Sequence, residues 1–80
     1  MTPREFLEHK YGVKLGEIFA VNYRVVEHGS LVESYNIDVA VQKIESDIKR
    51  MREVFACYDI DIKHAEQAVY DIWDKHLIVW

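Results

Sequence analysis

Apolar residues recur along the second half of the chain at intervals of three and four, which is the spacing of one face of an α-helix. The first such face comprises Val41, Ile44, Ile48, Met51, Phe55 and Tyr58. The second comprises Ile62, Ala65, Val69, Ile72 and His76, and it is widened by Ala68 and Trp73. We therefore expect two helices, with Asp38 and Asp61 as their N-caps. Because the link between them is short, they should form an antiparallel hairpin that lies on a sheet.

The first twelve residues predict a short helix with defined ends. Thr2 is the N-cap, and Glu5 at the third helical position completes a capping box with it. Gly12 supplies a left-handed residue at the C-terminal end, after which Val13 folds back toward the helix. The apolar side of this helix consists of Phe6, Leu7 and Tyr11.

Two segments between these helices, residues 17–26 and 30–37, have the composition of β-strands and are joined at Glu27-His28-Gly29. A two-residue loop would place apolar residues opposite polar ones, such as Phe19 opposite Asp38. A three-residue loop with Gly29 in the left-handed bulge position pairs apolar with apolar: Phe19 with Ile37, Val21 with Tyr35 and Val25 with Leu31. We choose this second register. The side facing the helices is then Phe19, Val21, Tyr23, Val25, Leu31, Tyr35 and Ile37, and the outer side is Ile18, Ala20, Asn22, Arg24, Val26, Val32, Ser34 and Asn36.

The last four residues, Leu77 to Trp80, are apolar, and the helical pattern stops just before them. Their β-branched and aromatic side chains favour a strand. A third strand would stabilise the sheet, since an isolated hairpin is marginal in water. The strand pairs either within the chain, which we expect, or with the edge of another copy. The prediction is an α+β fold in a single compact domain, residues 1–80.

Composition excludes several classes of protein. The 14 acidic and 10 basic residues give a net charge of −4, which is unfavourable for direct binding to nucleic acid and compatible with a protein partner that has a basic surface. Cys57 is the single cysteine, so no internal disulfide is expected. No segment resembles a signal peptide or a membrane span, so we expect a cytoplasmic protein.

No motif in the chain indicates chemistry. The four histidines, His9, His28, His64 and His76, lack metal-ligand spacing, and Cys57 has no second cysteine beside it. The carboxylate pairs Asp59/Asp61 and Asp71/Asp74 are explained as a helix start and a solvated helix face. With only three glycines there is no phosphate-binding loop. We expect no enzyme, no cofactor and no metal.

Two surfaces are candidates for binding a partner. On the predicted third helix, Glu66, Tyr70 and Asp74 follow one another at intervals of four, with Asp71 beside them. A tyrosine among carboxylates suits a basic protein partner; alternatively, Tyr70 covers a helix edge. The second candidate is the outer side of the sheet, with Ile18, Arg24 and Val32, which is either exposed or covered by the N-terminal helix; we expect cover because large exposed apolar patches are unusual.

Small size, acidity and the absence of chemistry favour a non-enzymatic interaction protein. By analogy of composition alone, such chains include phage- or mobile-element-encoded inhibitors, anti-CRISPR proteins among them, that block a host nucleic-acid-handling complex. Such an inhibitor would act in the host cytoplasm. The alternatives are a homo-oligomeric assembly subunit, for instance a homodimer, and a small enzyme with a site at a subunit interface.

Overall fold

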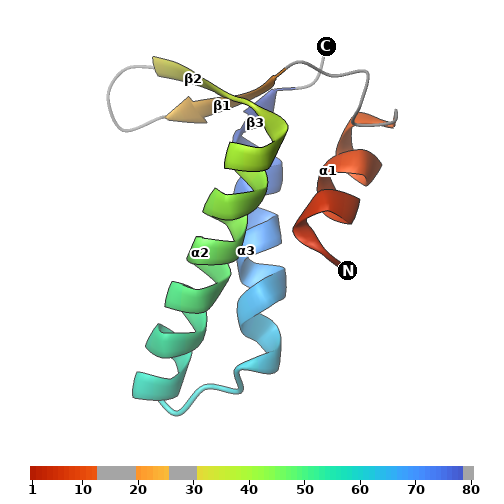
Figure 1. Cartoon of the computed structure of the whole chain (residues 1–80). Helices are drawn as coiled ribbons and strands as arrows, with labels where there is room; N and C mark the ends of the chain where they lie inside the picture. The colour runs from red at the N-terminus through yellow and green to blue at the C-terminus, as the bar shows by residue number, and fades with distance from the viewer. Residues whose placement is uncertain (13–19, 26–30, 79–80) are drawn as a thin grey trace.

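The computed structural model describes residues 1–12, 20–25 and 31–78 and confirms the α+β architecture. The elements are α1 (Pro3–Tyr11), β1 (Val21–Val25), β2 (Leu31–Tyr35), α2 (Ile37–Cys57), α3 (Lys63–His76) and β3 (Leu77–Ile78). Figure 1 shows the sheet at one end of the molecule, with α2 and α3 running away from it side by side as an antiparallel pair. The short helix α1 lies on the same side of the sheet as this helical hairpin.

The sheet has the strand order β2-β1-β3, with both pairings antiparallel. Val21 lies opposite Tyr35 and Val25 opposite Leu31, which confirms the register expected for the three-residue loop. Tyr23 lies opposite Leu77, so the C-terminal segment is a third strand paired within its own chain, as predicted. The predicted loop at Glu27-His28-Gly29, the positive φ of Gly29, and residues Phe19, Val79 and Trp80 lie outside the described residues.

Helix α1 has the ends that its sequence predicts. The Thr2 hydroxyl accepts from the Glu5 amide at 3.1 Å, and the Thr2 amide donates to the Glu5 carboxylate at 3.3 Å, which completes the capping box. Gly12 ends the helix in the left-handed region at φ 65°. Its amide donates to the carbonyl of Glu8 at 2.9 Å. The expected contact of Val13 lies outside the described residues.

The starts of α2 and α3 differ from the prediction. Asn36, not Asp38, caps α2: its backbone is extended, and its side chain accepts from the Val39 amide at 2.9 Å. Ile37 is therefore helical rather than the strand residue that was expected. Strand β2 ends at Tyr35, directly before the cap, so the helix begins two residues earlier than a cap at Asp38 would place it. At α3 the cap position is Ile62, although the Asp61 carboxylate accepts from the Lys63 amide at 3.0 Å.

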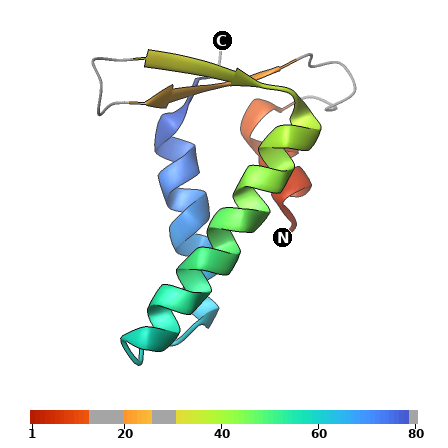
Figure 2. The same ribbon diagram turned by 60° about the vertical axis from the view of Figure 1, so that its left-hand side comes forward.

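The core lies where the sheet, α1 and the near half of the helical hairpin meet. It consists of Phe6, Leu7, Val21, Ala40, Ile44, Ile48, Val69, Tyr70, Trp73 and Leu77. Helix α1 contributes to this core and packs against α2. The expectation that α1 covers the outer side of the sheet is therefore wrong: α1 lies beside the helices on the inner side (Figure 2).

The far half of the helical hairpin extends beyond both the sheet and α1 (Figure 2). A helix of 21 residues, such as α2, is about 31 Å long, whereas α1 has only 9 residues. Two side chains that the helical spacing placed in the core are consequently exposed: Tyr58 at 74% and Ile62 at 51%. Ile72, which lies near the sheet end of α3, was also expected in the core and is 44% exposed. Among the described helices, none is long and apolar enough to cross a membrane.

Candidate functional site

The structure places Tyr70, the expected partner anchor, inside the protein. Tyr70 is 3% exposed, and its ring stacks on Phe6 of α1 with the centroids 4.8 Å apart. Its hydroxyl donates to the Glu66 carboxylate at 2.9 Å and to the Met1 carbonyl at 3.3 Å. Burial, followed by the hydrogen bond to Glu66, raises the pKa of the Tyr70 hydroxyl. The expectation of an exposed Tyr70 is wrong because α1 covers that side of α3.

The carboxylates around Tyr70 mostly hold the fold together. Asp74 pairs with Lys10 of α1 at 2.7 Å, and Glu66 lies 3.8 Å from the guanidinium of Arg52 in α2. Asp71 is exposed and accepts from the side-chain amide of Gln67 at 2.9 Å. Glu66 and Asp74 thus pair with side chains of other helices, whereas the contact of Asp71 stays within α3.

The outer side of the sheet is only partly covered over its described residues: Ala20 and Asn22 are half-buried, whereas Arg24, Val32 and Ser34 are exposed. Arg24 is exposed, and Val32, which lies opposite it in the register, is 46% exposed. The backbone carbonyl of Arg24 lies 2.6 Å from the Nδ1 atom of His76, so this strand is tied to the end of α3. Ile18, the third residue predicted for this surface, lies outside the described residues.

The groove between α2 and α3 is a surface that the sequence did not reveal. It encloses about 200 Å³ and is lined by Met51 and Val54 from α2 and by Val69, Ile72 and Trp73 from α3, with Asp47 and Arg50 at its edge. Helix α1 contacts α3 through Tyr70 and Asp74. The groove therefore opens on the other flank of the hairpin.

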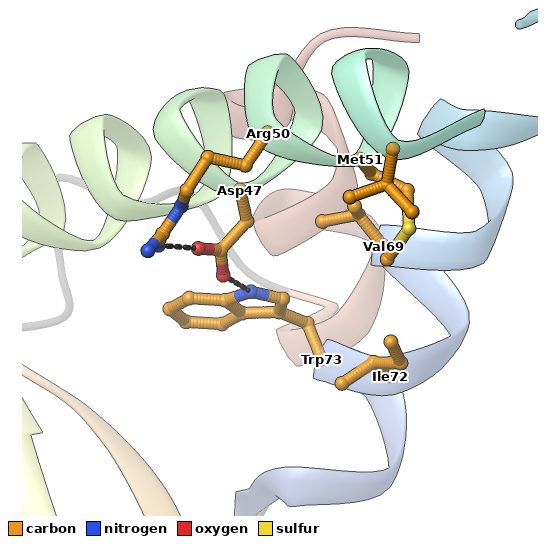
Figure 3. A pocket seen from close by; sticks show the side chains of 7 residues that line it. Asp47, Arg50, Met51, Val69, Ile72 and Trp73 are labelled. Atoms are coloured by element: carbon orange, nitrogen blue, oxygen red, sulfur yellow. Dashed lines mark hydrogen bonds and ion pairs between the residues drawn. The ribbon is translucent and has the colours of Figure 1, made fainter. Parts of the chain in front are cut away.

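A small polar network fixes one end of the groove (Figure 3). The indole Nε1 of Trp73 donates to one oxygen of Asp47 at 2.9 Å, and Arg50 donates to the other oxygen at 2.5 Å. The Trp73 ring also lies against Tyr23 of β1, with the centroids 4.7 Å apart. Since Trp73 is held from both sides, the groove has a preformed wall.

The groove continues into a second hollow toward the end of the hairpin. This hollow encloses about 460 Å³ and is lined by Arg50, Glu53, Val54, Cys57 and Tyr58, so the two hollows share Arg50 and Val54. Beyond it the link between the helices exposes further apolar side chains. We call Tyr58, Ile60 and Ile62 the hairpin tip; their exposed fractions are 74%, 47% and 51%.

A third hollow, of about 250 Å³, lies between the sheet and α2 and is lined partly by polar side chains. The ammonium of Lys43 lies 4.9 Å from the centroid of the Tyr35 ring. The Tyr35 hydroxyl donates to Glu33. Burial, followed by this hydrogen bond, raises the pKa of Tyr35 to about 12. Because Lys43 already occupies the face of the ring, this hollow offers less to a ligand than the groove does.

One signal in the sequence could have indicated the groove. Val54 is apolar but stands outside the helical face that runs from Val41 to Tyr58, and an apolar residue beside such a face widens it toward a further neighbour.

Within residues 1–12, 20–25 and 31–78, no three His, Cys, Asp or Glu side chains gather where they could hold a metal ion. No family model, curated protein or solved structure matches this chain.

Proposed function

We propose that the protein acts by binding another protein chain, without catalysis, and that its docking surface is the groove together with the hairpin tip. The observation that carries the proposal is the exposure of neighbouring apolar side chains: Val54 at 47%, Ile72 at 44%, and the three residues of the hairpin tip. Scattered apolar residues are normal on a protein surface, but a contiguous patch beside a preformed hollow is typical of a binding site.

The residue types of this surface also suit an interface. Aromatic residues, Met and Arg are enriched in the centres of protein interfaces. Met51 and Tyr58 lie along the surface, the Arg50 side chain at its middle is 72% exposed, and Trp73, which is 3% exposed, supports the groove from the core. Tyr58 takes the role of anchor that the sequence assigned to Tyr70, since it combines a large ring with high exposure.

We propose further that the partner is a host nucleic-acid-handling complex, which an anti-CRISPR-like inhibitor would block. This part of the proposal rests on the acidity and the small size of the chain. The net charge of −4 and the exposed carboxylate of Asp71 support approach to a basic partner, because such charges mainly accelerate association. Under this proposal, Asp71 steers the encounter, and the groove and hairpin tip supply the contact.

The test is affinity capture from cell extract with a matched pair of variants, Val54→Asp and Ala56→Asp. Both introduce one carboxylate near the end of α2, but two positions correspond to a rotation of about 200°, so Ala56 lies on the other side of the helix. Ala56 is exposed. We expect a partner that wild type and Ala56→Asp retain and Val54→Asp loses, with unchanged circular dichroism. A partner that binds Val54→Asp as it binds wild type would refute the proposed surface.

A further inference from the structure

The hollow between the sheet and α2 has aromatic rings among its walls. Tyr23, Tyr35 and Trp73 all line it. The centroid of the Tyr35 ring lies 6.2 Å from that of Tyr23 and 6.4 Å from that of Trp73, and the ring planes are inclined by 42° and 51°. The centroids of Tyr23 and Trp73 are 4.7 Å apart, at an inclination of 58°. Three rings inclined to one another thus border one space of about 250 Å³.

This hollow already holds a cation of its own chain. The ammonium of Lys43 lies 4.9 Å from the centroid of the Tyr35 ring, within the ~6 Å of a cation–π interaction. No carboxylate of the described residues pairs with this ammonium, so the ring face is what attracts it. Lys43 is exposed and carries its charge on a flexible stem. An apolar ligand gains nothing by displacing it, whereas another cation can take its place.

Two of the three rings donate a hydrogen bond to a carboxylate. The indole Nε1 of Trp73 donates to Asp47 at 2.9 Å, and the hydroxyl of Tyr35 donates to Glu33. A ring that donates to a carboxylate is polarised by it, so the face of the ring becomes more negative and attracts a cation more strongly. Burial, followed by the charges of Asp47 and Glu33, raises the pKa of the Tyr23 hydroxyl. The third ring therefore lies in the same negative field.

The charges beside the rings favour a cation over an anion. Arg50 pairs with Asp47 at 2.5 Å, so these two charges offset each other. Glu33 has no such partner among the ion pairs of the described residues. When Lys43 moves away, the charge that remains beside the rings is therefore the negative charge of Glu33. A cationic ligand restores the balance that Lys43 provides.

We infer that this hollow is a binding site for an alkylated ammonium group and that Lys43 is its internal occupant. Aromatic rings around a cation recognise quaternary ammonium groups in this way, and the ammonium of an unmodified lysine is more strongly hydrated. The group can belong to a free small molecule or to an alkylated lysine of a protein. The inference does not rest on the proposed function, because Val54 and the hairpin tip do not line this hollow.

The first experiment titrates the chain with tetramethylammonium chloride, with sodium chloride as the control for ionic strength. The indole Nε1–H of Trp73 is followed by ¹H–¹⁵N NMR, and we expect a saturable shift with a dissociation constant of about 1–10 mM. Lys43→Met should tighten binding about 3-fold or more, since the ligand then displaces no ammonium from the ring. Lys49→Met removes the same charge about 240° around α2 and should bind like wild type.

Two further variants test the Tyr35 ring and its carboxylate. Tyr35→Leu should abolish the saturable shift. Glu33→Gln, at an exposed position, should keep the fold and weaken binding about 2-fold, because the ring loses the charge that polarises it. If Tyr35→Leu does not fold, Glu33→Gln and Lys43→Met decide the matter. A Lys43→Met variant that binds no tighter than wild type would overturn the inference, and so would inorganic phosphate that gives the saturable shift in place of the ammonium.

A short peptide that contains trimethyllysine distinguishes the two sources of the ligand. Binding about 10-fold or more tighter than that of tetramethylammonium supports the site and assigns it to a protein side chain. Equal or weaker binding of the peptide, with tetramethylammonium still bound, supports the site and assigns it to a free small molecule. If neither probe binds even Lys43→Met, the hollow is not a cation site and the inference is wrong.

Discussion

Replacing Tyr70 by alanine should remove the contact that fixes α1 to the helical hairpin. The ring is 3% exposed and stacks on Phe6, so its loss leaves a cavity between α1 and α3. Truncating a buried aromatic residue to alanine costs about 3–5 kcal/mol. A chain of 80 residues has a total stability of roughly 4–12 kcal/mol. We therefore expect Tyr70→Ala to lose about 4 kcal/mol, a third or more of the total.

Tyr70→Phe is the matched control, since it keeps the ring and removes only the hydroxyl that donates to Glu66. The loss of that bond should cost about 1 kcal/mol, or about 4–8 °C in Tm for a domain of this size. Urea unfolding followed by circular dichroism measures both variants. Hydrogen exchange should show that amides of α1 lose protection in Tyr70→Ala before those of α2. A Tyr70→Ala variant within 1 kcal/mol of wild type would refute the role of this residue in the core.

Three further predictions follow from the elements described. Asn36→Ala should cost about 1 kcal/mol in urea unfolding, and Asp38→Ala should cost less, because Asn36 is the residue that bonds the start of α2; an equal or reversed order would contradict the cap. Because the folded-state pKa of Tyr35, about 12, lies above the ordinary value of 10.0, its contribution to stability is complete below pH 10 and is lost as the pH rises toward 12. Between pH 10 and pH 12, Tyr35→Phe should therefore lose less stability than wild type, as measured by the urea midpoint at each pH. If the midpoints of the two proteins fall in parallel as the pH rises, this prediction is wrong. Truncation after His76 removes β3, including Leu77 at 7% exposure, and should cost about 3 kcal/mol by the same denaturation assay; an unchanged midpoint would contradict a structural role for the strand.

Much of the fold follows from signals that act over a few residues. The capping box of Thr2 and Glu5 is complete within one turn of helix, so the sequence alone specifies it. The strand register follows from apolar matching, because a slip of one residue would turn every side chain to the other face. Strand β3 follows from the abrupt change of pattern after His76. These predictions needed no knowledge of distant contacts.

The misplaced residues depend on contacts between distant parts of the chain. The spacing within α3 puts Tyr70 beside the apolar face rather than in it, and only the docking of α1 buries it. Conversely, Tyr58 and Ile62 continue the apolar faces of α2 and α3 but lie beyond the reach of α1 and the sheet. Periodicity identifies the faces of a helix, but it does not show how far along that helix its neighbours extend.

The central position of β1 in the sheet has a consequence for the order in which the protein assembles. Its pairing with β2 closes a short loop, and a β-hairpin forms in about 1–10 μs. Its pairing with β3 joins segments separated by the whole helical hairpin, and closing so much longer a loop costs about 2 kcal/mol more in chain entropy. The formation of α2 and α3 offsets that cost, because the folded hairpin delivers β3 to the edge of β1. The hydroxyl of Tyr11 then donates to the Ile78 carbonyl at 3.2 Å, across 67 positions of sequence. We therefore expect completion of the sheet and docking of the N-terminal helix to occur in one cooperative step, in which both ends of the described chain become ordered together.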